Sequence, residues 1–292
     1  MYYIVYGILY IFSLLPFFIL YRIADFAYFL VYYVFGYRKK VVLSNLLIAF
    51  PEKTEKERIR IAKDFYHNLI DTFIESLKFI SISKKQILKR STGEFDLVNE
   101  FIAKGYSINL MAGHQFNWEY GNALYSMKLT VPYVGIYMPI TNKSLDRIFY
   151  NFRSKFGAIL ISATDFKNKM HGIFSGQHTI GLAADQNPGN PSNAYWMNFL
   201  GKPAPFVTGP SKGAIRNNSA VILFGFTKVK RGYYHFSAIK IAERASSYTP
   251  QQLTLLYKNE LEKVIRKDPA NYLWSHRRWK YDWKPEYGEI IS

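Results

Sequence analysis

Residues 106–127, YSINLMAGHQFNWEYGNALYSM, indicate the fold of this chain more clearly than any other stretch. The short apolar run at the start is typical of a buried strand, and a helical pattern follows it to about Met127. Similar strand-like runs recur at 132–138, 158–162, 179–185 and near 219–226, with helical patterns between them. Strands that alternate with helices predict an α/β fold with a central, mostly parallel sheet flanked by helices.

Local signals add detail to this prediction. Thr54 with Glu57 forms a capping-box pattern that predicts the start of a long helix, and the run at 249–252 predicts the start of a final helix. The segment YYHFSAIKI is expected to pair with the strand near 219–226 through a turn around 230–232.

The composition predicts an anionic partner. The chain has 292 residues with a net charge of +17, so phospholipid headgroups, nucleic acid or an acidic protein would attract it. Its 24 tyrosines and 23 phenylalanines are an excess that suits a membrane interface, where one end of each ring is apolar and the other is wet. The absence of cysteine excludes disulfides, a thiol nucleophile and a cysteine-based metal site.

The N-terminal segment is expected to be a membrane anchor. Residues 1–21 carry no charged side chain, and about 20 apolar residues in a helix can cross a hydrocarbon core. A second apolar run at 26–36 ends in the basic cluster 38–40, which favours the cytoplasm for this end of the anchor. An interfacial helix and a buried helical hairpin are the alternatives. We expect residues 1–40 to form the anchor and residues 41–292 the catalytic domain.

His114 and Glu119 are the candidate catalytic pair. Residues five apart on a helix are separated by about 140° around its axis, so they cannot face one point from mid-helix. They can converge if His114 lies on the turn after the strand, which Gly113 permits, and Glu119 lies in the next helix. The histidine could then take a proton from a hydroxyl group while the carboxylate fixes its tautomer. Alternatively, His114 caps a turn and Glu119 is a surface residue. The histidines show no metal-ligand spacing.

Several blocks of sequence resemble one enzyme family. GHQFNWE, residues 113–119, resembles the H-x4-D/E motif of glycerolipid acyltransferases, in the form seen in the lauroyl/myristoyl acyltransferase family of lipid A biosynthesis. This family lies within the lysophospholipid acyltransferase superfamily. Further resemblance is found, in the same order, in the blocks at 14–58, 152–161, 181–189, 199–210 and 272–280. The resemblance therefore covers most of the chain.

The resemblance implies an O-acyltransferase of the inner membrane, with its catalytic domain on the cytoplasmic face. An acyl group would pass from acyl-carrier protein or acyl-CoA, as co-substrate and without another cofactor, to a hydroxyl of an anionic lipid A precursor. His114 would be the general base and Glu119 its orienting partner. The substrate-binding residues implied by the matching blocks are Asn117, Arg153, Asp185 and Gln186. The expected partners are this donor, the lipid and the membrane, with no nucleic acid.

One position departs from the family pattern. Met138 stands where the family commonly has a basic residue, and Lys143 or Lys155 would have to supply the missing anion contact. The basic–aromatic cluster at 274–280 is expected either to dock on a headgroup surface or to be a solvated tail whose tryptophans pack on the core. Two other functions stay open: the same chemistry on an aminolipid, glycolipid or pigment lipid, and a non-catalytic membrane protein that binds anionic lipid.

Overall fold

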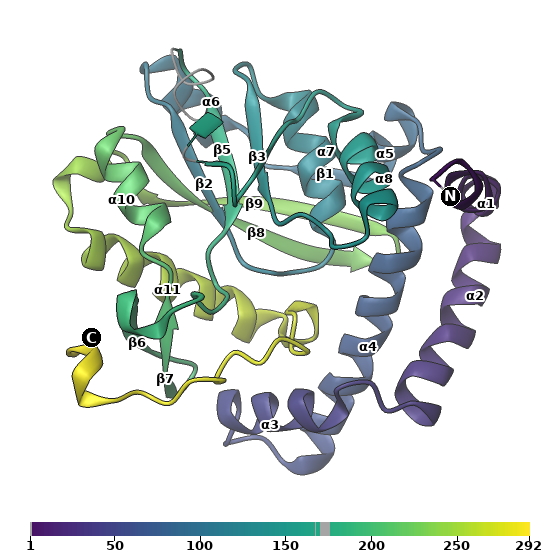
Figure 1. The fold of residues 1–292 in the computed structure, drawn as a ribbon, viewed down its shortest axis with the longest axis horizontal. Helices are drawn as coiled ribbons and strands as arrows, with labels where there is room; N and C mark the ends of the chain where they lie inside the picture. The colour runs from purple at the N-terminus through teal and green to yellow at the C-terminus, as the bar shows by residue number, and fades with distance from the viewer. Residues whose placement is uncertain (1, 167, 170–175) are drawn as a thin grey trace.

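The computed structural model describes residues 2–166, 168–169 and 176–292. Within these ranges a seven-stranded sheet has the order β1-β9-β8-β2-β5-β3-β4 (Figure 1). The five strands from β8 to β4 are mutually parallel, whereas β9 is antiparallel to β8 and β1 follows the direction of β9. The predicted α/β fold with a mostly parallel sheet is therefore confirmed. The strands are β1 (Ser91–Gly93), β2 (Ile108–Ala112), β3 (Tyr133–Tyr137), β4 (Ile159–Ser162), β5 (Thr179–Ala183), β8 (Ala220–Lys230) and β9 (Tyr233–Ala242).

Helices cover both faces of this sheet. One face carries α5 (Lys84–Arg90), α6 (Asp96–Ala103), α7 (Trp118–Lys128) and α8 (Lys143–Ser154), and the other carries α10 (Gly209–Arg216) and α11 (Pro250–Lys267) (Figure 1). A smaller sheet has the order β10-β6-β7, with bounds Ile290–Ile291, Tyr195–Phe199 and Lys202–Phe206. The layers leave the carboxyl ends of the parallel strands free for loops.

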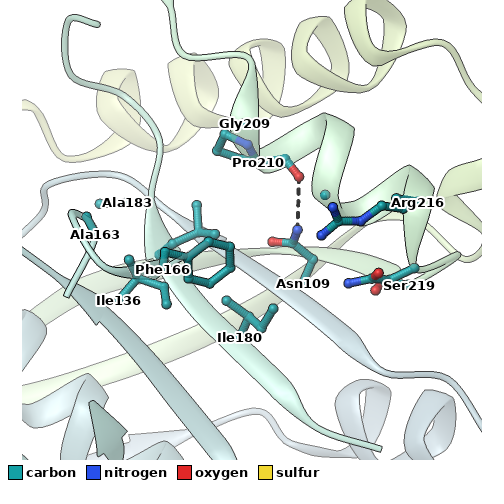
Figure 2. A pocket seen from close by; sticks show the side chains of 13 residues that line it. Asn109, Ile136, Ala163, Phe166, Ile180, Ala183, Gly209, Pro210, Arg216 and Ser219 are labelled. Carbon is teal, nitrogen blue, oxygen red and sulfur yellow. Dashed lines mark hydrogen bonds between the residues drawn. The ribbon is translucent and has the colours of Figure 1, made fainter. Parts of the chain in front are cut away.

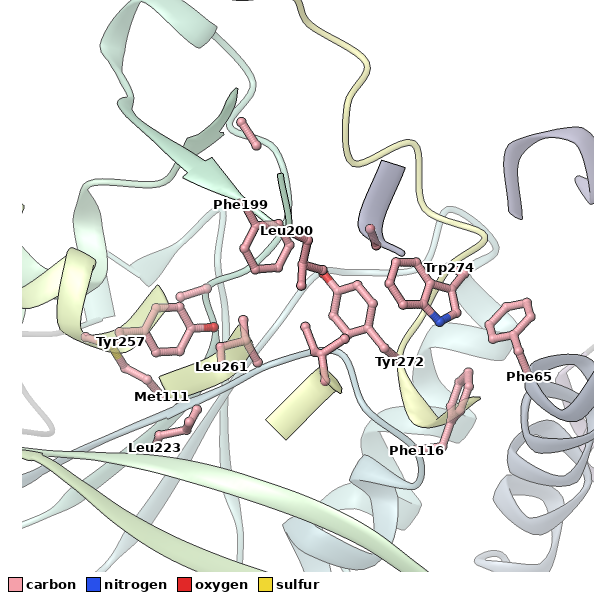
Figure 3. Packing of buried hydrophobic residues seen from close by; sticks show 14 of the residues in the cluster. Phe65, Met111, Phe116, Phe199, Leu200, Leu223, Tyr257, Leu261, Tyr272 and Trp274 are labelled. Atoms are coloured by element: carbon pink, nitrogen blue, oxygen red, sulfur yellow. The ribbon is translucent and has the colours of Figure 1, made fainter. Parts of the chain in front are cut away.

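The central strand β2 is buried on both faces. Leu110 packs with the helices α6 and α7, whereas its neighbour Met111 packs against Tyr257 and Leu261 of α11, as Figure 3 shows. Because successive side chains point to opposite faces, a strand covered by helices on both sides needs a nearly continuous apolar run. This explains why residues 108–112 show no polar alternation.

The local sequence signals are confirmed. Thr54 and Glu57 form a capping box at the start of α4 (Glu55–Lys78), and Thr249 does the same with Gln252 at the start of α11. β8 and β9 pair as an antiparallel hairpin, whose turn contains Gly232 with φ of +73°.

The N-terminal segment folds back along α4. It consists of α1 (Tyr2–Leu14), α2 (Phe17–Phe29), a short π-helix (Leu30–Val34) and α3 (Lys39–Ala49) (Figure 1). The stretch from Phe17 to Val34 is long and apolar enough to cross a membrane. One side of α2 packs on α4, while large apolar side chains on the other side, such as Phe18 and Phe26, are exposed. The alternative of a fully buried hairpin is therefore wrong.

Candidate active site

The loop 113–117 leaves β2 at the carboxyl edge of the sheet, where ligands bind in open α/β sheets. It is held by the C-terminal segment, because the N–H of Phe116 donates to the carbonyl of Asn271 at 3.0 Å and the N–H of Leu273 donates to the carbonyl of His114 at 2.9 Å. α11 approaches the loop closely at Gly113, where an added Cβ would lie 2.5 Å from a methyl carbon of Leu261 and would force that side chain to move. Gly113 does not have a positive φ, so it is this close packing, and not a left-handed backbone, that favours glycine here.

His114 is held by Asp185, which follows the neighbouring strand β5. The ring Nδ1 lies 2.6 Å from Oδ1 of Asp185, and the backbone N–H of His114 donates to Oδ2 at 2.9 Å. The Asp185 side chain is fully buried, whereas 26% of the His114 side chain is exposed. Two contacts from one carboxylate fix both the backbone and the ring of His114.

The carboxyl group of Asp185 is ionised at neutral pH. Burial by itself would raise its pKa, but the charge of His114 and the hydrogen bonds from His114 and Tyr272 outweigh burial and lower the pKa to about 2. An ionised carboxylate can only accept, so Nδ1 of His114 carries a proton in this contact whether the ring is charged or neutral. When the ring is neutral, Nε2 then carries the lone pair that a general base requires.

Glu119 does not hold His114, contrary to the prediction. It is the second residue of α7, is 2% exposed, and accepts hydrogen bonds from Arg153 of α8 through Nε at 3.1 and 3.0 Å and Nη2 at 2.5 Å. The indole N–H of Trp118 donates to the same carboxylate at 3.0 Å. The start of α7 turns this side chain toward α8, whereas the neighbouring strand β5 brings Asp185 to the histidine.

Arg153 and Glu119 therefore form an ion pair between two helices. Burial would lower the pKa of Arg153, but the Glu119 carboxylate raises it above the usual value. The Arg153 side chain is 18% exposed, and its contacts with Glu119 already occupy the Nε and Nη2 groups. This geometry gives Arg153 a role in the packing of α7 on α8. Its contact with substrate stays a prediction.

Asn117 supports the loop from inside the protein. Its side chain is fully buried, with Oδ1 accepting from the N–H of Glu119 at 3.1 Å and Nδ2 donating to Oε2 of Glu75 at 2.9 Å. Asn117 is thus the buried N-cap of α7, and its predicted contact with substrate stays a prediction.

Glu75 of α4 completes this support, and it is a site residue that the sequence did not predict. It is fully buried and also accepts hydrogen bonds from Tyr21 of α2 and Tyr234 of β9, each at 2.8 Å. Burial, with a contribution from Asp71, raises the pKa of Glu75. A glutamate among the buried residues of an amphipathic helix was the available signal, because a buried carboxylate needs partners.

The remaining predicted residues lie on several different elements. Gln186 follows Asp185 and is half-buried. Met138 is exposed just after β3, and Lys143 is exposed at the start of α8. Lys155 donates to the carbonyls of Phe79, Ile80 and Ile82 at 3.4, 3.2 and 2.8 Å, so it stabilises the chain after α4.

The cluster at 274–280 is divided between the core and the surface. Trp274 and Arg278 are each 1% exposed, and the guanidinium carbon of Arg278 lies 4.4 Å from the ring centre of Phe206. Arg277 and Lys280 are exposed. The expectation of a single headgroup-docking surface is therefore wrong for Trp274 and Arg278, which pack inside the protein because they face the small sheet and α3.

The fold and the site define a class of catalyst. A histidine held through Nδ1 by a buried, ionised carboxylate at the carboxyl edge of a parallel sheet can activate a hydroxyl group for attack. The chain matches the family model described as bacterial lipid A biosynthesis acyltransferase over residues 1–281. It belongs to this family and is an O-acyltransferase, as its sequence blocks predict.

Curated relatives extend this similarity over most of the chain. The chain is 22% identical to a lipid A biosynthesis lauroyltransferase of Escherichia coli over 94% of its own length and 89% of the relative. It is 26% identical to a lipid A biosynthesis acyltransferase of Haemophilus influenzae, over 83% of the chain and 78% of the relative. A lipid A biosynthesis palmitoleoyltransferase of Escherichia coli is 20% identical over 83% of the chain and 79% of the relative.

Proposed function

We propose that this protein transfers a fatty acyl group from a thioester to a hydroxyl group of a lipid A precursor, with His114 as the general base and Asp185 as its carboxylate partner. The observation that carries the proposal is the 2.6 Å contact between Nδ1 of His114 and Oδ1 of the buried Asp185, on a histidine whose side chain is 26% exposed. The names of the relatives, which act in lipid A biosynthesis, support the acceptor.

In the proposed reaction, Nε2 of His114 takes the proton of the acceptor hydroxyl as its oxygen attacks the thioester carbonyl carbon. The new C–O bond forms, and the C–S bond breaks as the tetrahedral intermediate collapses. The imidazolium returns the proton to the leaving thiolate. Asp185 stays ionised and stabilises the imidazolium between these steps, so no covalent acyl-enzyme is required.

The donor is proposed to be acyl-carrier protein or acyl-CoA. Acyl-carrier proteins are acidic and coenzyme A carries phosphates, so the net charge of +17 suits either donor as well as an anionic lipid acceptor. We expect the reaction to occur at the inner membrane with the catalytic domain in the cytoplasm, because the basic cluster follows the apolar helix.

The catalytic test compares the wild-type protein with His114→Ala in membranes that are supplied with an acyl thioester and a tetra-acylated lipid A precursor. We expect the wild type to increase the lipid mass by one acyl group and the variant to lose this activity. Thermal unfolding and membrane fractionation control for folding and location. Activity retained by the variant would contradict the mechanism. No activity in either folded protein would contradict the acceptor and favour another lipid or a non-catalytic role.

An apolar pocket beside the site is proposed to hold the acyl chain. It has a volume of about 240 Å³ and lies between the sheet and α10, and Figure 2 shows Ile136, Ile180 and Ala183 on its wall. Asn109 is fixed at its edge by a hydrogen bond to the carbonyl of Pro210 at 3.1 Å. Ala183 is only two residues before Asp185, so the pocket begins close to the His114–Asp185 pair.

Gly213 offers a way to test this pocket. It lines the pocket, and a Cβ added there meets no atom within 4 Å, so a larger side chain would extend into free space. We expect Gly213→Leu to lower the preference for long acyl donors relative to short ones by about tenfold. Each methylene group that no longer fits the pocket costs about 0.8 kcal/mol, and about two of them account for this factor. Gly189→Leu, at another glycine with open space around it, is the control. An unchanged chain-length profile would contradict the acyl pocket.

We propose that the apolar helix lies in the plane of the membrane. At its N-terminal end, Nζ of Lys78 donates to the carbonyls of Ser13 and Leu15 at 2.7 and 2.9 Å. One turn into α2, the hydroxyl of Tyr21 donates to the buried carboxylate of Glu75. These contacts join the anchor to α4 over several turns.

The other half of the anchor is also joined to the catalytic domain. Arg231 bridges Asp25 of α2 and Asp71 of α4 at 2.7 and 2.6 Å, and the Tyr28 ring stacks on His67 at 3.5 Å between centres. If the helix left α4 to span the bilayer, buried charged groups would lose their partners, which is strongly unfavourable. An in-plane helix keeps these contacts and inserts its exposed aromatic side into the lipid.

Phe26 distinguishes the two arrangements because it is exposed and lies midway between Phe17 and Val34. We would place Phe26→Trp protein in vesicles with lipids brominated near the headgroup or deep in the acyl chains, and subtract the wild-type emission. An in-plane helix, buried about 5–10 Å, predicts stronger quenching by shallow bromines. Stronger quenching by deep bromines would indicate a spanning helix, and no quenching by either would contradict membrane insertion.

A further inference from the structure

A second pocket lies between α3 and the C-terminal segment and has a volume of about 260 Å³. Its walls differ in character from those of the apolar pocket, because they carry three cationic side chains and no acidic one. The lining residues are Lys40, Val41, Ser44, Asn45, Arg277, Trp279 and Lys280. A concave site with several positive charges and no negative one is suited to an anion.

The three cations of this pocket are available to a ligand. Lys40, Arg277 and Lys280 are exposed, and none of them forms a salt bridge with any residue that the structure describes. Lys280 has one neutral contact, to the hydroxyl of Tyr281 at 3.2 Å. Like charges that are held close together without counterions repel each other, so a bound multivalent anion stabilises them strongly.

Both walls of the pocket are fixed in place. Nδ2 of Asn45 donates to the carbonyls of Trp274 and His276, each at 2.8 Å, and joins α3 to the C-terminal segment. Nη1 of Arg38 donates to the carbonyl of Ser275 at 3.0 Å. The backbone that carries the cations is therefore preorganised, which lowers the entropic cost of binding.

The pocket lies within reach of the catalytic histidine. The N–H of Leu273 donates to the carbonyl of His114, and four residues of chain lead from Leu273 to Arg277. Because each residue spans at most about 3.6 Å, the Cα atoms of Leu273 and Arg277 are no more than about 14 Å apart. One substrate molecule can thus place a reacting group at His114 and a charged group in this pocket.

We propose that Lys40, Arg277 and Lys280 bind a phosphate group of a substrate while its reacting group lies at His114. Arginine and lysine donors match phosphate oxygens, with arginine able to form two parallel hydrogen bonds. The inference rests on the proposed acyl transfer, which supplies two molecules with suitable phosphates: the lipid acceptor and the donor, through its phosphopantetheine arm. The location just after the apolar helix favours a group at the level of lipid headgroups.

The test uses the full chain in detergent micelles with the triple variant Lys40→Gln, Arg277→Gln, Lys280→Gln. The matched control neutralises three exposed lysines elsewhere, Lys85→Gln, Lys240→Gln and Lys267→Gln, and changes the net charge equally. KM is measured for a bisphosphorylated lipid A precursor and for the same lipid after phosphatase treatment. It is also measured for acyl-CoA and for a phosphate-free acyl-N-acetylcysteamine donor.

We expect the pocket variant to raise KM by about tenfold for the one phosphate-bearing substrate that the pocket binds, and to leave kcat nearly unchanged. Removing the phosphate from that substrate should remove the difference between variant and wild type. A difference that disappears with the dephosphorylated lipid assigns the pocket to the acceptor, and one that disappears with the phosphate-free donor assigns it to the donor. Equal losses in the pocket and control variants, or no loss in either, would overturn the proposal.

A binding measurement separates this inference from the proposed reaction. In the His114→Ala background, the lipid and acyl-CoA are titrated into the protein with and without the pocket substitutions. Phosphate-dependent binding that the pocket variant weakens by about tenfold would support the pocket even if no acyl transfer were found. Binding that is independent of the phosphate would overturn the pocket even if acyl transfer occurs.

Discussion

Two buried carboxylates near the loop 113–117 have different partners. Asp185, two residues after β5, holds the ring of His114 at 2.6 Å, whereas Glu119, in the first turn of α7, is paired with Arg153 of α8 at 2.5 Å. Both are almost completely inaccessible to solvent. Glu119 is five residues from His114 in the sequence and Asp185 is 71 residues away, yet the distant residue makes the contact.

The difference follows from the geometry of a parallel sheet. β2 and β5 are adjacent and in register, with Ala112 opposite Ala183, so the loops that follow them leave the sheet side by side. Residues at the end of one strand thus meet those at the end of its neighbour. The helix that starts at Trp118 instead directs Glu119 toward α8. We therefore expect Asp185 to affect chemistry and Glu119 to affect stability.

The largest effect is expected for Asp185→Asn. The amide keeps the size of the side chain but cannot hold the His114 proton on Nδ1 as a carboxylate does. By analogy with the serine-protease triad, where the same change costs about 10⁴-fold, we expect kcat to fall by about 10³–10⁴-fold. Acyl transfer under saturating donor and acceptor measures this loss, with circular dichroism to confirm the fold. A fall of less than tenfold would remove Asp185 from the mechanism.

Glu119→Ala should act mainly through stability. It leaves the guanidinium of Arg153 without its buried partner, and breaking such a pair typically costs about 3–5 kcal/mol. Denaturant unfolding should show this loss, and Arg153→Met in the same chain should recover part of it. The control is Glu260→Ala, which breaks an exposed pair with Lys263 and should cost less than about 1 kcal/mol. A stable Glu119→Ala protein without activity would return Glu119 to the catalytic pair.

Asn117→Ala should have an intermediate effect on both properties. The change removes the N-cap of α7 and one of three hydrogen-bond donors to the buried Glu75. Loss of a cap costs about 1 kcal/mol, and a buried group left short of a partner adds about 1–3 kcal/mol. We expect a lower melting temperature and a smaller loss of kcat than for Asp185→Asn. Activity abolished at full stability would instead indicate a direct contact between Asn117 and substrate.

The smallest expected effect is a pH dependence near the Asp185–His114 pair. Burial lowers the pKa of His276 to about 4; the charge of Asp185 opposes this, and the positive charges of Arg278, His114 and Arg38 add to it. In the unfolded chain the pKa of histidine is about 6.5, so the unfolded state binds the extra proton between these values. Its contribution to stability is therefore present above about pH 6.5 and is lost as pH falls toward 4.

Melting temperatures at pH 7.5 and 5 measure this effect. The wild type should lose more stability on acidification than His276→Asn does, because the variant has no buried imidazole to protonate. His235→Asn, at a more exposed histidine, is the matched control and should behave like the wild type. Equal acid destabilisation of the wild type and His276→Asn would show that the pKa of His276 is not lowered in the folded protein.

The fold could be predicted from the sequence in considerable detail. The apolar runs at 106–112 and 179–185 predicted two of the parallel strands, and Thr54 and Thr249 marked two helix starts. Strand burial and helix capping could be predicted because they depend on residues close in the chain. The site was predicted less completely. His114 lies at the expected strand end, but the partner of its ring depends on which strand lies next to β2, and periodicity does not report strand order.

The sequence by itself determined the alternation of strands and helices, the apolar N-terminal segment, the family and the position of His114 at a strand end, since each is set by local spacing or by ordered sequence blocks. Only the tertiary structure decided that Asp185 holds His114, that Glu119 pairs with Arg153, and that α2 packs on α4. These contacts join residues far apart in the chain. Such contacts form only when strand order and helix packing bring their elements together.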